Sequence, residues 1–238
     1  MVPDFITLLA NRTGSRGRRT WRLSSGDIGT VEEVAREYYM NERGFCGCLI
    51  DSACTYGGLL WILFHDILFH DNMQSHQPLC AQFYHTAERF YELHREQIES
   101  RLSEYQENRE HVFDANLPRF LSHPFFNDPR SRIGRHHGSW TRRNASALRS
   151  FAIGAPEHND IALIREVLRT SRRGVNTGWP DLVVWDRGKV MFAEVKSTDQ
   201  LSDEQCDWIA AHAGSNEVEP IRVVEADSPE TDDGHVRS

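Results

Sequence analysis

Two carboxylates and a lysine near residue 190 have the types and spacing of a site that cleaves phosphodiesters. Asp181 opens one apolar run, and Glu194 and Lys196 close a second. Carboxylate oxygens suit hard cations such as Mg²⁺ or Mn²⁺. A metal held there can polarise a phosphodiester and acidify a bound water, while the lysine supports the attacking water or the developing charge.

Two strands must position these groups. Residues 181–186 and 189–196 are rich in β-branched and aromatic residues, and Arg187-Gly188 separates them, which predicts a β-hairpin. In a strand, Glu194 and Lys196 leave the same face because they are two residues apart. The hairpin also brings Asp181 opposite Glu194, so the three charged groups are expected to meet.

The other elements follow from capping signals and hydrophobic periodicity. Their alternation predicts an α/β sandwich around a small mixed sheet. Before the hairpin we expect a flexible basic lead-in over 1–26, a helix capped by Thr30 and Glu33 that runs to about 41, and a buried helix over 57–71. A long half-exposed helix over 82–109, loops with short helical pieces over 110–150 and an amphipathic helix over 160–171 should follow. After the hairpin we expect a helix capped by Ser202 and Gln205 with Trp208 and Ile209 inward, a strand over 220–225, and a disordered acidic end.

Composition fits one folded domain. The 238 residues are 39% hydrophobic and 26% charged, values typical of a globular protein. The apolar run at 59–68 is too short to span a bilayer, and we expect no signal peptide and no membrane association. Five cysteines without a CxxC pair are expected to be free thiols in a reducing compartment.

The charged hairpin also carries a family resemblance. Pro180-Asp181 followed by Glu194-x-Lys196 resembles the PD-(D/E)XK nuclease signature. The longer string, from Arg172-Arg173-Gly through Gly-x-Pro-Asp-Leu-Val-Val-Trp and Glu-Val-Lys to Leu-Ser, Gln and Trp, resembles the VRR-NUC domain of the Fanconi-associated nucleases. Upstream, 31–45 and 58–71 are similar to the helical segment before that family's nuclease core. The resemblance covers roughly 31–225.

The resemblance implies a restriction-endonuclease-like PD-(D/E)XK core, a small mixed sheet flanked by helices, with a helical N-terminal extension. It divides the chain into a basic lead-in (1–30), a nuclease domain (31–225, catalytic core about 160–225) and an acidic tail (226–238). It further implies a nuclear, metal-dependent, structure-selective DNA nuclease that cuts near 5′ flaps, has 5′→3′ exonuclease action, and repairs interstrand crosslinks, with branched DNA and repair proteins as partners.

The same resemblance assigns roles to residues. Asp181, Glu194 and the Val195 carbonyl would hold Mg²⁺ or Mn²⁺, Lys196 would assist the water, and Gln205 would lie near the site. The family usually adds a third acidic ligand, often Glu, but an ungapped match puts Ser52 at that position. Asp51, one residue earlier, is expected to replace it as a metal ligand; Glu166 is a further candidate.

Net charge is −8, which argues against a broadly basic surface for nucleic acid. Arginines nevertheless cluster at 12–22, 132–149 and 165–173, and each cluster is either a phosphate-binding patch or a solvated loop. Arg172 and Arg173, next to the expected site, are predicted to contact DNA phosphates. His136-His137 is expected in a phosphate-facing or simply exposed loop.

Three alternatives remain open on the sequence alone. The chain could be a catalytically impaired DNA-binding module, which Ser52 favours, or a non-enzymatic fragment of a larger repair nuclease. Asp66 and His70 lie at i, i+4 in an expected helix, a spacing that can bind zinc, although the sequence offers no third ligand at a recognisable interval.

Overall fold

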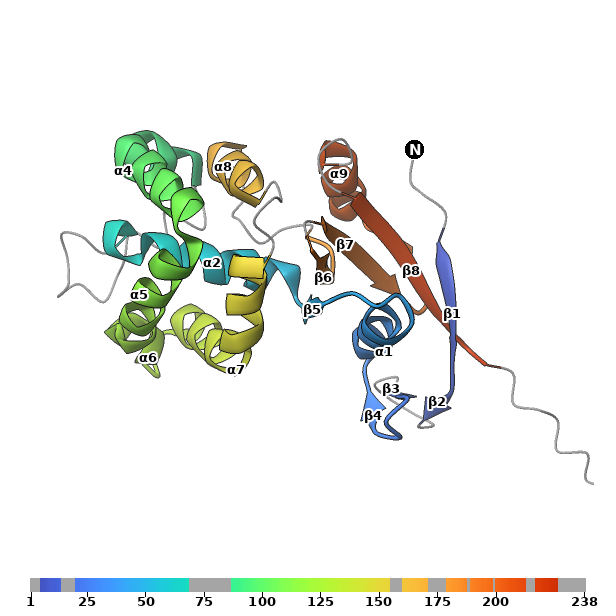
Figure 1. Cartoon of the computed structure of the whole chain (residues 1–238). Coiled ribbons are helices and arrows are strands. Elements are labelled where there is room, and N and C mark those ends of the chain that lie inside the picture. Colours follow the sequence, from blue (N-terminus) through green and yellow to red (C-terminus); the bar gives the residue numbers. More distant parts are fainter. Residues whose placement is uncertain are drawn as a thin grey trace, which may run out of the picture.

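The computed structural model describes residues 5–13, 20–68, 87–154, 160–170, 179–187, 189–198, 200–212 and 217–226. Short strands open the described chain, a run of helices fills its middle, and strands return toward the C-terminus, as Figure 1 shows. In chain order they are β1 (Ile6–Ala10), β2 (Arg12–Thr13), β3 (Thr20–Arg22), β4 (Ile28–Gly29), α1 (Val31–Glu37) continued by the π-helical turn η1 (Tyr38–Glu42), β5 (Gly47–Ile50), α2 (Ser52–Leu68), α4 (Ala87–Glu107), α5 (Arg109–Ser122), α6 (Pro124–Asn127), α7 (Arg132–Gly154), α8 (Asp160–Thr170), β6 (Leu182–Asp186), β7 (Lys189–Lys196), α9 (Asp203–His212) and β8 (Glu217–Glu225).

A mixed five-stranded sheet lies at the centre of the part that carries the hairpin. Its order is β1-β8-β7-β6-β5, with parallel pairing of β1, β8 and β7 and antiparallel pairing of β7, β6 and β5. A small second sheet joins β2, β3 and β4. The expected flexible lead-in is therefore wrong for β1: Ile6, Leu8 and Ala10 alternate, pack on the core, and hold an edge strand against β8.

Each face of the large sheet has its own core. Alternate residues of the hairpin, such as Leu182 and Ala193, pack under α1 together with Ala35 and Tyr39. The intervening residues, such as Val183 and Phe192, join the larger core under the helices. Because both faces are covered, Leu182 to Trp185 are all buried, and the hairpin shows continuous rather than alternating hydrophobicity.

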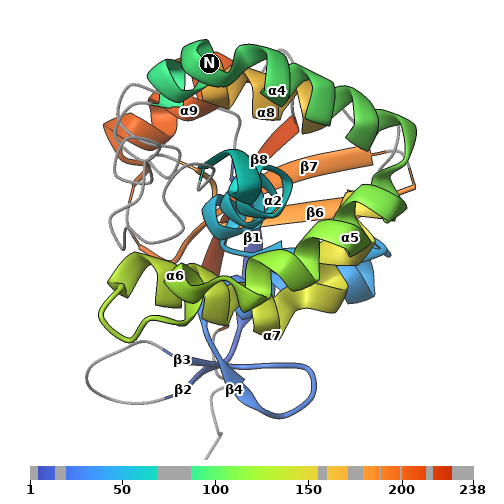
Figure 2. The same ribbon diagram turned by 90° about the vertical axis from the view of Figure 1, so that its left-hand side faces the viewer.

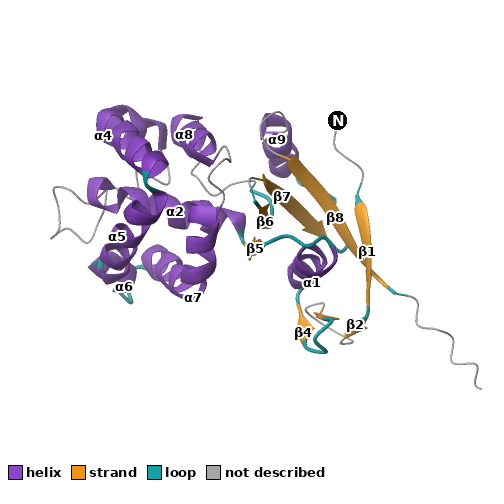
Figure 3. Cartoon of the chain, viewed as in Figure 1, coloured by secondary structure: helices purple, strands orange, loops and turns teal. Residues whose placement is uncertain are grey.

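Helices α2 and α4 to α8 gather on one side of the sheet (Figure 3). Helices α1 and α9 lie directly beside the sheet. Figure 2 looks from the helical side and shows α2 in front of the sheet, between α4 with α8 and the group α5 to α7. The predicted buried helix at 57–71 is α2, which begins five residues earlier than expected. None of the described helices is long and apolar enough to cross a bilayer.

Both predicted capping boxes are present. In α1, the Glu33 N–H donates to Thr30 Oγ1 and the Thr30 N–H donates to the Glu33 carboxylate at 2.7 Å. In α9, the Ser202 N–H donates to Gln205 Oε1 at 2.9 Å, and Trp208 is buried as predicted. The long helix near 82–109 and the amphipathic helix near 160–171 are also confirmed as α4 and α8.

The prediction of loops over 110–150 is wrong. This region forms α5, α6 and α7, with Pro118 inside α5 and Pro124 at the first turn of α6, where proline is tolerated. In α7 two of the positions facing the core are polar, His137 and Thr141, and both are buried. These polar residues interrupt the apolar periodicity, so the sequence pattern hid a 23-residue helix.

Candidate active site

The hairpin brings the two predicted carboxylates together. Leu182 is paired with Ala193, so Asp181 and Glu194 occupy opposite positions one residue further along. The Val195 N–H donates to Asp181 Oδ2 at 2.9 Å, which fixes that carboxylate against β7. The negative charge of Asp181 acts on Glu194 and raises its pKa, as expected for carboxyl groups at opposite positions of one hairpin.

Lys196 and Gln205 complete this cluster. The Lys196 Nζ and the Gln205 Nε2 both contact Glu194 Oε1. The capping box orients the Gln205 amide: its oxygen accepts the Ser202 N–H, so its NH₂ group is free to donate to Glu194. A helix cap thereby sets the direction of a polar group at the site.

The site raises the pKa of both carboxyl groups, and that of Glu194 the more. Burial raises the pKa of Glu194 to about 7, and the negative charge of Asp181 adds to the rise, whereas Lys196 opposes it. Burial also raises the pKa of Asp181, against the opposing effect of the Val195 N–H and of Lys196. Two buried carboxylates at one point therefore favour retention of a proton until a cation compensates their charge.

The donor set fits a hard divalent cation. Glu194 is fully buried, and its Oε2 has no hydrogen-bond partner among the residues that the structure describes. A buried carboxylate oxygen without a donor is costly unless something positive satisfies it. Asp181 and Glu194 would hold Mg²⁺ or Mn²⁺, and Val195, whose carbonyl was predicted to assist, lies between Glu194 and Lys196 on the same strand.

Asp51 does not join this cluster. Asp51 lies opposite Asp181 in the pairing of β5 with β6, and its N–H donates to the Asp181 carbonyl at 2.6 Å. However, Asp51 has a φ of 72°, and its Oδ1 accepts the Cys54 N–H at 2.8 Å, so the carboxylate caps α2. Within the described ranges, no third acidic side chain groups with both hairpin carboxylates at metal-sharing distance.

Ser52, at the position of the usual family glutamate, has a structural contact instead. It is fully buried, and its hydroxyl donates to the Pro180 carbonyl, immediately before Asp181. Ser52 therefore holds the segment that delivers Asp181 to the site. A glutamate at this buried position requires the Pro180 segment to move.

Glu32 is an acidic residue near the site that sequence reasoning missed. It lies in the first turn of α1, the helix that packs on β5 and β7, and its negative charge further raises the pKa of Asp181. The capping box located this turn in the sequence but gave no sign that α1 crosses the sheet beside the hairpin. Glu166, the other candidate considered, lies on α8, which packs chiefly against α4.

Most of the described arginines predicted as possible phosphate contacts already have partners. Arg149 pairs with Asp114 at 2.7 Å, and Arg165 pairs with Glu99 at 2.8 Å. These contacts favour the structural interpretation for the two arginines. Arg172 and Arg173 lie outside the described residues, so their contact with DNA stays a prediction.

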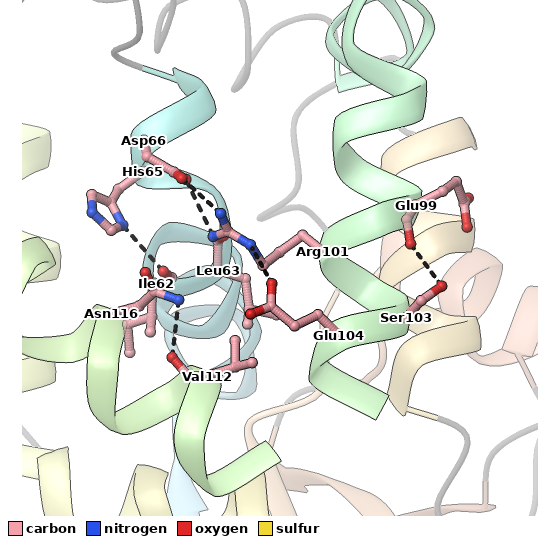
Figure 4. Close-up of polar contacts among 10 residues, drawn as sticks. All are labelled: Ile62, Leu63, His65, Asp66, Glu99, Arg101, Ser103, Glu104, Val112 and Asn116. Carbon is pink, nitrogen blue, oxygen red and sulfur yellow. Dashed lines mark hydrogen bonds and ion pairs between the residues drawn. The ribbon is translucent and has the colours of Figure 1, made fainter. Parts of the chain in front are cut away.

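The zinc interpretation of Asp66 is not supported by its surroundings. Figure 4 shows that Asp66 faces Arg101, which donates to Asp66 Oδ2 at 2.7 Å and also approaches Glu104. The neighbouring His65 points to the Ile62 carbonyl at 3.1 Å. Asp66 is thus part of a contact between α2 and α4, and His70 lies outside the described residues.

The histidine pair at 136–137 lies on a helix, so the expected loop is wrong there too. His136 is exposed on α7, whereas His137 is 3% exposed and its ring lies 6.2 Å from that of Trp61. Burial lowers the pKa of His137 to about 4, so this ring is neutral at physiological pH. His137 belongs to the helical core.

Comparisons with known proteins agree with this geometry. A family model described as the VRR-NUC domain matches residues 130–227. The Fanconi-associated nuclease 1 homolog of Caenorhabditis elegans is 25% identical over 195 residues, which are 78% of this chain and 22% of that protein.

Solved structures extend the likeness of fold to nearly the whole chain. A crystal structure of paFAN1 bound to DNA with a 1-nt 5′ flap and a gap aligns with a TM-score of 0.56, at 15% identity, over 96% of this chain and 39% of the other. The complex with a 2-nt 5′ flap gives 0.53, at 17% identity, over 95% and 38%.

The chain thus spans about a fifth of the curated relative and about two fifths of the solved chains. The predicted PD-(D/E)XK-type architecture, a mixed sheet flanked by helices, is confirmed. The residues that match the family model include the hairpin, α9 and the final strand, which carry all the clustered side chains. Residues 130–227 therefore match the VRR-NUC domain, in a chain that resembles the Fanconi-associated nucleases.

Proposed function

We propose that this chain is a metal-dependent DNA nuclease domain. The observation that carries the proposal is the meeting of Asp181, Glu194, Lys196 and Gln205, with a buried Glu194 oxygen that has no hydrogen-bond partner within the described ranges. The VRR-NUC match and the likeness to Fanconi-associated nuclease 1 support the same chemistry. Asp181 and Glu194 would bind the metal. Lys196 and Gln205 would orient Glu194 and the reacting groups.

Three residues of the chain, Asp181, Glu194 and Lys196, would have separate roles in the reaction. Mg²⁺ or Mn²⁺, when bound, supplies Lewis acidity toward the phosphodiester. Asp181 and Glu194 would bind it as carboxylates, so the raised pKa of Glu194, about 7, makes metal binding compete with protonation of that side chain. Lys196, 16% exposed and in contact with Glu194, is positioned to assist the attacking water or to stabilise negative charge on the phosphate.

The finer features of the proposal concern substrate and setting. We infer structure-selective cutting near 5′ flaps, 5′→3′ exonuclease action and a nuclear role in interstrand-crosslink repair, with branched DNA and repair proteins as partners. Support comes from the likeness to paFAN1, whose structures contain 5′-flap DNA. Since the chain spans only part of those proteins, flap recognition is a property to be tested on this chain.

A second candidate is a DNA-binding module with impaired catalysis. Two observations favour it: Ser52 is buried and hydrogen-bonded to Pro180, and the Asp51 carboxylate caps α2. With only Asp181 and Glu194 as acidic ligands, metal affinity would be lower than in a site with three.

One titration separates these functions. Purified protein is mixed with a labelled 5′-flap duplex, and Mn²⁺ or Mg²⁺ is added over a wide concentration range while cleavage and binding are both followed. Metal-dependent cutting supports the nuclease. Binding without cutting at any metal concentration supports the impaired module, and the absence of both identifies a non-enzymatic fragment and contradicts both proposals.

A further inference from the structure

A second group of metal-ligating side chains lies outside the hairpin site. In the part of the chain that the structure describes, Asp51, Cys54 and His136 bring one carboxylate oxygen, one sulfur and one ring nitrogen within 4.8 Å of one another. The Cys54 Sγ lies 3.4 Å from His136 Nε2. Cys54 is buried, Asp51 is half-buried and His136 is exposed, so the group opens to solvent on one side.

Two separate parts of the fold build this group. Asp51 follows β5 and has a φ of 72°, a conformation that non-glycine residues rarely adopt and that turns its side chain toward the start of α2. Cys54 lies in the first turn of α2. His136 reaches the same point from α7, 82 residues away in sequence, so its presence is a product of tertiary packing rather than of local helix spacing.

The chemistry of the three groups is that of a zinc site. Thiolate and imidazole prefer Zn²⁺ and its relatives over Mg²⁺, and one carboxylate is compatible with either. With usual zinc–sulfur and zinc–nitrogen bond lengths, two ligands of a tetrahedral ion lie about 3.6 Å apart. The 3.4 Å between Cys54 and His136 is close to this value.

We propose that Asp51, Cys54 and His136 bind Zn²⁺, with water as the fourth ligand on the exposed side. The Cys54 thiol releases its proton to solvent when the ion binds, and thiolate, carboxylate and Zn²⁺ then have no net charge. The occupied site joins the start of α2 to α7. Because the Asp51 N–H also holds the Asp181 carbonyl at 2.6 Å, the ion would stabilise the backbone that delivers Asp181.

Cobalt is the probe for this site. The full chain, stripped of metal with EDTA, is titrated with Co²⁺ while the thiolate-to-cobalt charge-transfer band and the visible bands of tetrahedral cobalt are recorded. We expect one equivalent to give both signals and Zn²⁺ to displace it. The Cys54→Ser variant should lose the charge-transfer band. His136→Gln removes a direct ligand and should weaken Co²⁺ binding by at least the roughly 10- to 100-fold that loss of an outer-shell partner costs.

Three control variants separate this site from other ligands. Cys46→Ser and His111→Gln change exposed residues of the same types and should leave the cobalt spectrum unaltered. Glu194→Gln, in the hairpin site, should also leave it unaltered. Circular dichroism checks that Cys54→Ser is folded, and His136→Gln, which changes an exposed side chain, provides the test if it is not.

The proposal is overturned by any of three results. The first is a cobalt titration without a charge-transfer band, and the second is a band that survives in Cys54→Ser. The third is His136→Gln protein that binds Co²⁺ as tightly as the wild type. In those cases the three side chains form a hydrogen-bonded cap on α2 and nothing more.

Discussion

At the scale of single residues, ionisation of the buried Glu194 lowers the stability of the metal-free protein. Glu194 is fully buried beside Asp181, and its pKa rises from an ordinary 4.5 to about 7. The folded chain therefore binds this proton more tightly than the unfolded chain. The resulting stabilisation is complete below pH 4.5 and is lost as the pH rises through 7.

The Glu194→Gln variant tests this effect of the Glu194 charge on stability. Without metal, at pH 8, we expect it to be more stable than the wild type by up to about 3 kcal/mol, because the amide needs no proton to remain neutral. At pH 5 the two proteins should differ much less. Urea unfolding in EDTA at both values measures the difference, and a variant less stable than the wild type at pH 8 would contradict the assignment of a strained carboxylate pair.

Glu32 and Glu33 are adjacent acidic residues with different expected roles. Glu32 acts electrostatically on Asp181, whereas the Glu33 side chain accepts the Thr30 N–H at 2.7 Å. Glu32→Gln should raise several-fold the Mn²⁺ concentration needed for half-maximal cleavage. Glu33→Gln should instead destabilise the fold by about 1 kcal/mol or less and leave that concentration unchanged. Equal metal dependence in both variants would remove Glu32 from the site.

At the scale of elements, a buried ion pair joins α5 to α8. Arg109 at the start of α5 donates to both oxygens of Asp160 at the start of α8, at 2.7 and 2.8 Å. Both side chains are nearly inaccessible. Because both helices belong to the helical side of the molecule, loss of this ion pair should destabilise that part of the fold.

Asp160→Ala should therefore be strongly destabilising. Removal of one partner leaves the Arg109 charge buried, which costs about 3–5 kcal/mol. The matched control is Asp114→Ala, which breaks the exposed pair with Arg149 and should cost less than about 1 kcal/mol. Thermal or urea unfolding of the two variants gives the comparison. Similar destabilisation of both would mean that the Arg109 pair is more hydrated than its burial indicates.

At the scale of the whole molecule, local signals in the sequence predicted the parts but not their arrangement. The hairpin and both capping boxes were predicted correctly because each depends on residues close together in the chain. Strand β1 was missed because its pairing with β8 spans the entire chain. The direction of the Asp51 side chain was not predictable for a related reason: a positive φ brings its carboxylate to the Cys54 N–H, and no spacing rule encodes that turn.

DNA binding is also a property of this scale, because the effects of many phosphate contacts add together. Arg172 and Arg173 precede the hairpin, and their joint replacement by Gln should weaken binding to all sequences alike. The slope of log affinity against log salt should decrease by about one unit for each phosphate that is no longer neutralised. Fluorescence anisotropy at several salt concentrations measures this slope; an unchanged slope and affinity would exclude phosphate binding by this pair.

We propose that Asp181 and Glu194 hold the metal that this chain uses to cleave DNA. The most direct test is the rate of Mn²⁺-dependent cleavage of a labelled 5′-flap duplex by the wild type and by Glu194→Ala, with circular dichroism as the check of folding. We expect cleavage by the wild type and none detectable by the folded variant, because a metal ligand has been removed. Cleavage by Glu194→Ala at the wild-type rate would contradict it.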